Sequence, residues 1–348
     1  MTTLKDVAKY VGVSVATVSY VLTGRGSVSG EMSERVLAAV EELGYRPNRK
    51  AQAMRTGISN SIGIILPDLT KPFFPLLAQQ VENKARQAGY AVLLVDCQNK
   101  TEAEEEGFEL LSQQGVDGVI WFPINNTLPK SFERLLCPVV LIDRSLPGCD
   151  TVHCDYSHGG QLQAEYVIKM KHKKVGLLSG PKTVESARKR RRGFVNAAKG
   201  KFDIVWELDI PFSSQLPEAA INALKRQEAS MIVCADDLMA IGTMGALNDL
   251  KIKVPDQVSV IGFDNISWST VVTPKLTTIN QPISEIGAEA INLLQHRIAN
   301  TRKRKEASRT IILDVDLVER ASTMEMSSYA AKKLVKKKQK KKQKRNKA

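Results

Sequence analysis

The stretch DVAKYVGVSVATVSYVL, residues 6–22, contains two short apolar repeats separated by a turn. Apolar residues recur at helical spacing in both halves, as Val7 and Val11 do in the first and Val18 and Leu22 in the second. Two helices this short bury little apolar surface by themselves. Their purpose therefore has to be sought in the residues around them.

The flanks of this stretch predict where its helices begin and end. Thr3 and Asp6 have the spacing of a capping box, so a first helix starts near residue 4. Gly12 ends that helix, because glycine readily adopts the left-handed conformation of a C-terminal cap. Ser14 offers an N-cap oxygen to a second helix over about 15–22.

A third helix is predicted from Ser29 to Leu43, and Gly44 closes it. Three small helices, two of them joined by a tight turn, form a helix-turn-helix arrangement. A helical subdomain that only packs is the alternative. Against it, the outward side of the second helix carries small or hydroxyl-bearing groups and no Glu or Lys, which suits close approach to a DNA groove. These positions are Ser14, Val15, Ala16, Thr17, Ser19 and Tyr20.

From residue 61 onward the pattern changes to short apolar runs alternating with amphipathic stretches. Runs such as IGIIL (62–66), AVLLV (91–95), GVIWF (118–122) and VVLID (139–143) read as buried strands separated by helices. This alternation predicts parallel sheets covered on both faces. The number of units favours two doubly wound lobes over one large sheet, and ligands of such sheets bind beyond the carboxyl ends of the strands.

Charge is concentrated at the two ends of the chain. The 348 residues carry a net charge of +13, but eleven Lys or Arg lie in residues 331–348, and residues 1–330 carry only +2. We expect the Lys-rich tail to be disordered. It is either a solubilising extension or a non-specific nucleic-acid contact that weakens with salt.

Several classes of protein are disfavoured by composition. The five cysteines include no C-x-x-C pair, so we expect reduced thiols, no metal site and no cofactor. No apolar run is long enough to span a membrane, and no signal-peptide core is evident near the N-terminus. Nucleotide-binding glycine motifs and the usual hydrolase motifs are missing from the sequence. The sequence therefore predicts a cytoplasmic protein that is not an enzyme.

The order of motifs resembles the lactose-repressor/galactose-repressor family of bacterial transcription regulators. The resemblance spans about residues 3–322 and is carried by TLKDVAKYVGVSVATVSYVLTG, SIGIILPDL, ADDLMAIG, VPDQVSVIGFDN and LTTINQP. It implies an all-α helix-turn-helix headpiece followed by an α/β, periplasmic-binding-protein-like core of two doubly wound parallel-sheet lobes. It also implies a homodimer that binds a near-palindromic operator.

The resemblance suggests boundaries for these parts. Residues 1–46 would form the headpiece, 47–60 a hinge helix and linker, and 61–322 the effector-binding and dimerisation domain. Within that domain we expect a first lobe of about 61–155 and 285–322 and a second lobe of about 156–284. The disordered tail would occupy 323–348.

The family places the start of the second helix in the major groove, where Val15, Ala16 and Tyr20 match its base-reading positions. Ser14, Thr17 and Ser19 are better suited to phosphate contacts. In the segment 47–57, Met54 matches the apolar wedge that paired hinge helices insert into the minor groove. The other hinge positions of interest are Arg49, Ala51 and Arg55. An ordinary charged linker is the alternative.

Polar and aromatic residues at the predicted strand ends suggest an effector pocket between the lobes. Aromatic faces stack on sugar or base rings, and Asp and Arg bond to hydroxyls or ring nitrogens. The candidate effector-binding residues, most of which match family pocket positions, are Asp68, Phe73, Phe74, Arg144, Ser186, Arg190, Phe212, Asp237 and Asp264. Each has a structural alternative as a core residue, turn or cap.

The identity of the effector is left open by the sequence. Purine-binding family members carry an arginine where this chain has Val184, which favours a sugar. The basic run Arg188–Arg192 suggests an anionic or phosphorylated sugar, although an unliganded basic surface explains it equally well. We expect a repressor of a carbohydrate-utilisation operon. The alternatives are a response to a purine or nucleoside, or catabolite control through a protein partner.

Overall fold

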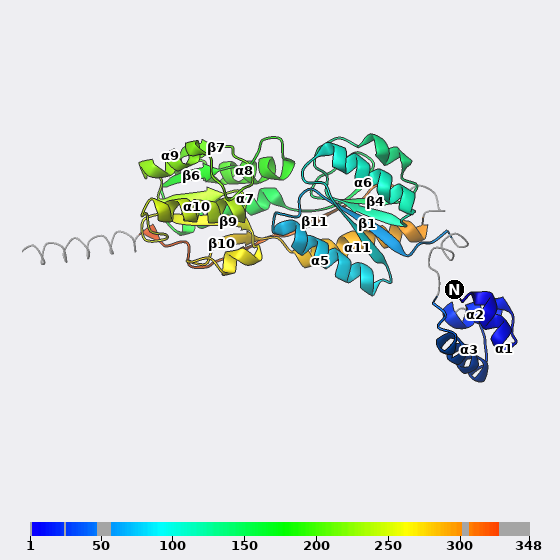
Figure 1. The fold of residues 1–348 in the computed structure, drawn as a ribbon. Helices are drawn as coiled ribbons and strands as arrows, with labels where there is room; N and C mark the ends of the chain where they lie inside the picture. The colour runs from blue at the N-terminus through cyan, green and yellow to red at the C-terminus, as the bar shows by residue number, and fades with distance from the viewer. Residues whose placement is uncertain (1, 24–25, 47–56, 301–305, 327–348) are drawn as a thin grey trace, which may run out of the picture. The chain divides into compact units, whose positions relative to one another are not determined.

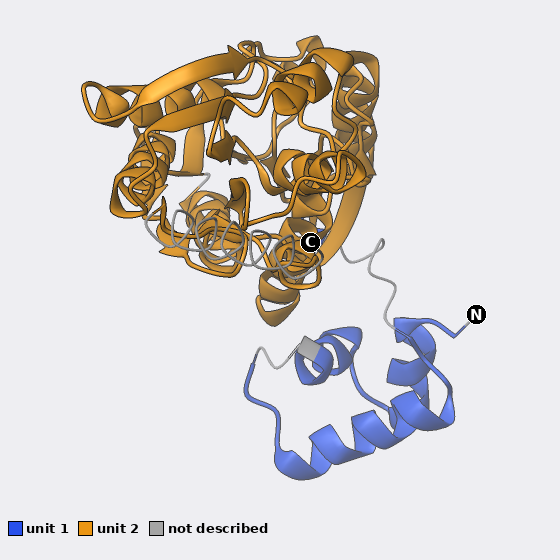
Figure 2. Ribbon diagram, turned by 90° about the vertical axis from the view of Figure 1, so that its left-hand side faces the viewer, with its two compact units in different colours: residues 1–60 blue, residues 61–348 orange. Residues whose placement is uncertain are grey.

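A computed structural model describes residues 2–23, 26–46, 57–300 and 306–326, and it divides into two compact units. Unit 1 is Met1–Asn60 and unit 2 is Ser61–Ala348 (Figure 2). The predicted hinge residues Arg49, Ala51, Met54 and Arg55 lie outside the described residues, as does the Lys-rich run of 331–348. Each unit is described by itself below.

Unit 1 contains three helices, α1 (Leu4–Val11), α2 (Val15–Thr23) and α3 (Gly30–Glu42) (Figure 1). Apolar residues from all three meet in one small core, made of Val7, Ala8, Val11, Val18, Val36 and Ala39. The helix-turn-helix prediction is therefore confirmed in the described part of this unit.

The predicted caps hold these short helices in place. The Thr3 hydroxyl accepts the Asp6 N–H, while the Asp6 carboxylate accepts the Thr3 N–H at 2.8 Å, which completes the capping box. Gly12 adopts a left-handed φ of 75° at the end of α1. The Ser14 hydroxyl accepts the Thr17 N–H at 3.0 Å and the Ser29 hydroxyl accepts the Met32 N–H. Each such cap stabilises a helix by about 1 kcal/mol.

The described residues of unit 2 form two six-stranded sheets with matching strand orders. The first sheet has the order β11-β5-β4-β3-β1-β2 and the second has β12-β10-β9-β8-β6-β7. Every pairing is parallel except β10 with β12. The first sheet consists of β1 (Ser61–Leu66), β2 (Ala91–Asp96), β3 (Gly118–Trp121), β4 (Val139–Ile142), β5 (Asp150–Cys154) and β11 (Thr310–Leu313). The second consists of β6 (Lys174–Leu178), β7 (Asp203–Leu208), β8 (Met231–Cys234), β9 (Ser259–Asp264), β10 (Thr277–Asn280) and β12 (Asp316–Val318).

Helices cover both faces of each sheet, which gives two lobes. In lobe 1, α5 (Phe73–Gln87) and α11 (Ile283–Asn300) pack on one face and α6 (Thr101–Gln114) on the other (Figure 1). In lobe 2, α7 (Tyr156–Lys169) and α8 (Glu185–Ala198) pack on one face. The opposite face carries α9 (Glu218–Arg226) and α10 (Asp237–Asp249). Two short 3-10 helices, η1 (Lys130–Arg134) and η2 (Ser267–Thr270), lie in connecting segments.

The chain passes between the lobes three times, after β5, after β10 and after β11. The two parallel-sheet lobes confirm the predicted fold class. One expected boundary differs from the structure: β12 pairs with β10, so the last part of 285–322 belongs to lobe 2. The reason is that a single antiparallel pairing at the edge of the second sheet leaves almost no periodic signal in three residues.

The expected start of the disordered tail at residue 323 also needs correction. Thr323 is buried, and its hydroxyl lies 2.7 Å from the Tyr166 hydroxyl of α7. The Met324 carbonyl oxygen lies 3.1 Å from His172 Nε2, and the Met326 N–H donates to the Met170 carbonyl. These contacts fix residues 323–326 to lobe 2.

Among the residues that the structure describes, none of the helices is both long and apolar enough to cross a membrane.

Candidate functional site

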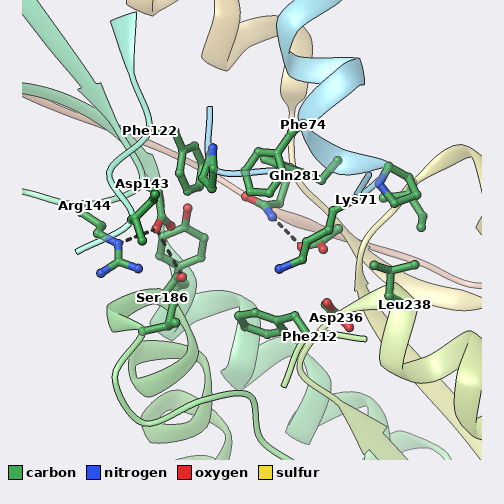
Figure 3. Close-up of a pocket in the computed structure, with 18 of the residues that line it drawn as sticks. Lys71, Phe74, Phe122, Asp143, Arg144, Ser186, Phe212, Asp236, Leu238 and Gln281 are labelled. Atoms are coloured by element: carbon green, nitrogen blue, oxygen red, sulfur yellow. Dashed lines mark hydrogen bonds and ion pairs between the residues drawn. The ribbon is translucent and has the colours of Figure 1, made fainter. Parts of the chain in front are cut away.

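A cavity of about 180 Å³ lies between the two lobes, where the carboxyl ends of both sets of parallel strands meet (Figure 3). Segments after β1, β3 and β4 line it from lobe 1, and α8, α10 and the segment after β9 line it from lobe 2. Parallel strands direct their following loops to the same edge, so a cleft at this place is expected for doubly wound sheets.

Aromatic rings form the apolar walls of the cavity. Phe73 and Phe74 open α5, and their rings pack edge to face with that of Phe122, with centroids 4.9 Å apart for Phe74 and Phe122. Phe212 approaches from lobe 2, and Figure 3 shows it on the other side of the cavity from Phe74 and Phe122. A Cβ on Gly180 would lie 2.6 Å from the Phe212 ring, so glycine is needed there to let the ring in.

Lobe 1 contributes a buried acid–base pair at the end of β4. Asp143 adopts a left-handed φ of 78°, and its carboxylate accepts the Ser186 hydroxyl from lobe 2 at 3.5 Å. Arg144 Nε lies 3.9 Å from the same carboxylate, and Arg144 Nη1 donates to the Asn126 side-chain oxygen at 2.9 Å. Burial lowers the pKa of Arg144, and the negative charges of Asp143 and Glu104 oppose that shift.

Lobe 2 contributes a second pair from different elements. Arg190 of α8 donates to the Ala235 carbonyl at 2.6 Å, and its Nη2 lies 3.3 Å from Asp264 Oδ1. The guanidinium carbon is 3.9 Å from the centroid of the Phe263 ring. Gln281 Nε2 donates to Asp264 Oδ1 at 2.6 Å. Burial raises the pKa of the Asp264 carboxyl, while the charge of Arg190 and the bond from Gln281 lower it.

Three buried polar atoms of these groups have no hydrogen-bond partner among the described residues: Arg144 Nε, Arg190 Nε and Gln281 Oε1. All three residues line the cavity. An unsatisfied buried donor or acceptor costs about 1–3 kcal/mol, which a ligand with hydroxyl or carbonyl groups can recover. The residues of the cavity wall therefore carry two unpaired donors and one unpaired acceptor.

Two of the residues predicted to bind the effector lie behind the cavity wall instead of on it. The buried Asp237 carboxylate accepts the Thr278 hydroxyl at 2.5 Å and the Ile266 N–H at 2.9 Å, so its oxygens are occupied. Asp68 accepts the Thr70 hydroxyl and the Asn99 side-chain N–H at 2.8 Å. Neither aspartate lines the cavity, whereas Asn99 does.

The acid of α10 that does line the cavity is Asp236, one residue before the predicted Asp237. Its carboxylate accepts the Met239 N–H at 2.7 Å and so caps α10. Burial, together with the charge of Asp264, raises the pKa of Asp236, and the charge of Lys71 from lobe 1 lowers it.

The structure brings the remaining predicted residues together around one cavity. They are Phe73, Phe74, Arg144, Ser186, Arg190, Phe212 and Asp264. Sequence analysis missed Lys71, Phe122, Tyr156, Asp236, Leu238 and Gln281, which also line it. Phe122 and Gln281 each directly follow a strand, so the strand-end rule applied to β3 and β10 would have found them.

The basic run Arg188–Arg192 is dispersed around α8. Lys189 pairs with Glu185 at 2.8 Å, and Arg191 pairs with Glu207 of β7. Arg190 alone of the run lines the cavity. The run is therefore spread over several partners and does not form one anion site.

In unit 1, the predicted DNA-contacting face of α2 is accessible. Val15 is 40% exposed and Tyr20 is 51% exposed, although both are large apolar side chains. Ser14 and Ala16 are also exposed, and Thr17 and Ser19 are half-buried. Val18 alone among these neighbours is fully buried, which fixes the orientation of the helix.

Comparison with known proteins defines the class. Residues 3–48 match the model of bacterial regulatory proteins of the lacI family. Residues 59–321 match the model of periplasmic binding proteins and the sugar-binding domain of the LacI family. The chain belongs to the LacI family of bacterial transcription regulators.

Curated relatives of the chain include repressors of two kinds. The HTH-type transcriptional repressor PurR of Pasteurella multocida is 33% identical over 337 residues, covering 92% of this chain and 98% of that protein. The ribose operon repressor of Halalkalibacterium halodurans is 34% identical over 302 residues, covering 86% of this chain and 91% of that protein.

Solved structures agree with this assignment. The Lac repressor dimer bound to operator and an anti-inducer matches with a TM-score of 0.80 and 27% identity, over 93% of this chain and 99% of that one. A LacI-family regulator from Enterococcus faecalis with bound ribose matches with a TM-score of 0.68 and 28% identity, over 76% of this chain and 99% of that one.

Proposed function

We propose that this protein is a cytoplasmic, homodimeric repressor that binds a near-palindromic operator and is controlled by a neutral monosaccharide in the cavity between its lobes. Its relatives support the regulatory role, since those compared above are transcriptional repressors. We assign it a regulatory and not an enzymatic activity on the same ground. The exposed face of α2 would enter the major groove, with Val15, Ala16 and Tyr20 toward the bases.

The balance of charged side chains in the cavity is the main support for a neutral monosaccharide as the effector. Three basic side chains, Lys71, Arg144 and Arg190, face three acidic ones, Asp143, Asp236 and Asp264. The formal charges cancel when all three carboxyls are ionised, and an additional phosphate or carboxylate then meets carboxylates without a surplus cation. A sugar hydroxyl both donates and accepts, and therefore suits alternating carboxylate and guanidinium groups.

The aromatic walls support a ring-shaped ligand. Phe74 and Phe122 from lobe 1 and Phe212 from lobe 2 offer faces and edges on two sides of the space in which such a ring would sit. A pentose or hexose presents C–H groups to such surfaces and hydroxyls around its rim. The solved LacI-family structure with bound ribose makes D-ribose the first probe.

A purine effector is the second candidate, because the PurR relatives cover almost the whole chain. Val184 lines the cavity at the position where the resemblance led us to expect an arginine in purine-binding members. The cavity residues thus favour the sugar. A sugar phosphate is a further outcome of the titration below, and binding of none of its ligands would favour a protein coregulator.

Control would follow from a shift between two conformations. An effector that touches both lobes binds more tightly to one relative arrangement of the lobes than to another. It therefore changes the population of the arrangement that binds operator. Whether the effector acts as an inducer or a corepressor depends on which arrangement of the lobes binds the operator.

The experiment is isothermal titration of the full-length protein with D-ribose, D-ribose 5-phosphate, hypoxanthine and guanine, each repeated as a thermal shift. At one hundred times its dissociation constant a ligand stabilises the native state by about 2.7 kcal/mol. Binding of D-ribose or another neutral sugar alone supports the proposal. Binding of only the phosphate or only a purine overturns the effector assignment and leaves the repressor assignment in place.

A further inference from the structure

The cavity wall of lobe 1 rests on a buried carboxylate that sequence analysis did not single out. Glu104, in the first turn of α6, is 1% exposed, and Phe108 of the same helix belongs to the buried apolar core of lobe 1. A carboxylate in an apolar core costs stability unless it is fully compensated. Its partners therefore indicate what it is for.

The partners of Glu104 are at the end of β3. Glu104 Oε1 accepts the indole N–H of Trp121 at 2.8 Å and the backbone N–H of Ile124 at 2.9 Å. Between these two donors lie Phe122 and Pro123, and Phe122, Pro123 and Ile124 all line the cavity. One buried carboxylate oxygen thus holds both ends of the cavity-lining turn.

The same turn is held a second time, by a residue of the cavity. Arg144 Nη1 donates to the Asn126 side-chain oxygen at 2.9 Å, two residues beyond Ile124. Burial raises the pKa of Glu104 and lowers the pKa of Arg144, and the attraction between the two opposite charges opposes both shifts. The segment 122–126 is therefore fixed from behind by Glu104 and from the front by Arg144.

We infer that Glu104 is a positioning residue that acts with Arg144 as a clamp on segment 122–126 and thereby sets affinity for the effector. This inference rests on the proposed function, since it assigns a role in the cavity proposed to bind a sugar. Arg144 lines the cavity, and its buried Nε has no hydrogen-bond partner among the described residues. A ligand that engages this atom contacts the clamp directly.

The neighbouring Glu105 provides a matched control. It lies on the same helix and accepts the Lys130 N–H at 2.7 Å and the Ser131 N–H at 2.9 Å, so it caps η1. It is adjacent in sequence and is also a glutamate, and its hydrogen bonds also tie α6 to the β3–β4 connection. Among the described residues, the hydrogen bonds of Glu105 go to Lys130 and Ser131 and not to segment 122–126, so Glu105→Gln separates a general effect on α6 from the clamp.

The test uses the full chain with Glu104→Leu, Glu104→Gln and Glu105→Gln. Amide hydrogen exchange of peptides covering 122–126 is measured without ligand, and D-ribose affinity by titration. Glu104→Leu should raise exchange in 122–126 and weaken D-ribose binding about tenfold or more, the effect of losing hydrogen bonds to a charged group. Glu104→Gln keeps an acceptor oxygen, so its exchange should stay near that of the parent while its affinity falls less. Glu105→Gln should change neither.

The exchange measurement decides the clamp even without a sugar. Parent-like exchange in 122–126 for Glu104→Leu overturns it, as does an equal rise for Glu105→Gln. If Glu104→Leu fails to fold, the Glu104→Gln affinity decides: parent-like D-ribose binding there overturns the inference. Failure of the parent to bind D-ribose or any other neutral sugar counts against the proposed function, whereas the exchange result still judges the clamp.

Discussion

The two lobes share a strand order but supply different chemistry to the cavity. Asp143 follows β4 in lobe 1, and Asp264 ends the corresponding strand β9 in lobe 2. Both adopt left-handed backbone conformations, with φ of 78° and 116°, which are unusual for a residue other than glycine. The equivalent backbone thus carries a carboxylate to the cavity from both sides.

The cations that balance these carboxylates come from different places. In lobe 1 the next residue in sequence, Arg144, lies beside Asp143, and it contacts Asn126 of the same lobe. In lobe 2 the next residue is Asn265, and the cation is Arg190 of α8. The difference teaches that a repeated fold fixes where ligands bind, whereas the charges at the site are set separately in each half.

The largest expected effect comes from removing the cation of lobe 2. Arg190→Ala leaves Asp264 buried beside Gln281 without a charged partner, and breaking a buried pair in this way costs about 3–5 kcal/mol. The measurement is urea denaturation at neutral pH. Arg188→Ala, at an exposed position of the same helix, is the control and should change stability by less than about 0.5 kcal/mol. Equal losses in both variants would contradict the pairing.

Substitution of the two aspartates, Asp143 and Asp264, should affect stability and ligand binding to different extents. Asp143→Asn keeps a residue that tolerates positive φ and leaves Arg144 near Glu104, so we expect little loss of stability and about 1.5–3 kcal/mol weaker D-ribose binding. Asp264→Asn removes the anion from Arg190 and should weaken both. Titration and urea denaturation of the two variants check this. Equal stabilities of the Asp143→Asn and Asp264→Asn variants would show that the two acid–base pairs contribute equally to stability.

Substitution of the aromatic residues of the two lobes should produce a smaller difference in stability and sugar affinity. Phe74→Ala opens the packed group around Phe122 and should reduce both stability and sugar affinity. Phe212 is half-buried, so Phe212→Ala should reduce D-ribose affinity by about 1 kcal/mol and stability less. Unchanged affinity in the Phe212 variant would remove lobe 2 from the proposed ring contact.

The smallest expected effect is a dependence of stability on pH. Burial raises the native pKa of Asp236 and Asp264 above the ordinary value of 3.8, so the native state holds these protons more tightly than the unfolded chain does. Their contribution to stability is complete below about 3.8 and is lost as pH rises through the raised native pKa. Asp236→Asn should reduce this loss, measured by urea denaturation between pH 4 and 8. A variant with the slope of the parent would refute the assignment to Asp236.

Local sequence patterns were sufficient to predict the helix caps of the headpiece. The capping box of Thr3 and Asp6, the left-handed Gly12 and the N-caps Ser14 and Ser29 all occur where they were predicted. Each of these interactions joins residues at most a few positions apart. The residues nearby in sequence therefore determine these caps, and no distant part of the chain is needed to predict them.

The sequence predicted that the two lobes are parallel α/β sheets. It did not predict the edge strand β12 or the C-terminal segment 323–326. Strongly apolar strands such as β1 and β3 were predicted, because burial on both faces gives continuous apolar runs. The three-residue β12 and the segment 323–326 depend on partners far away in sequence, namely β10 and α7. Such pairings leave no periodic trace of their own.

The sequence by itself determined that this protein has a helix-turn-helix headpiece, two parallel-sheet lobes and a polar, aromatic set of strand-end residues. Tertiary structure alone decided which of those residues face the cavity. Asp236 lines it and Asp237 does not, because one step along a helix start turns a side chain toward Thr278 and Ile266. It also decided that Glu104 of α6 supports the wall formed by residues 122–124. Periodicity reports burial, whereas the direction of a side chain depends on contacts between segments distant in the chain.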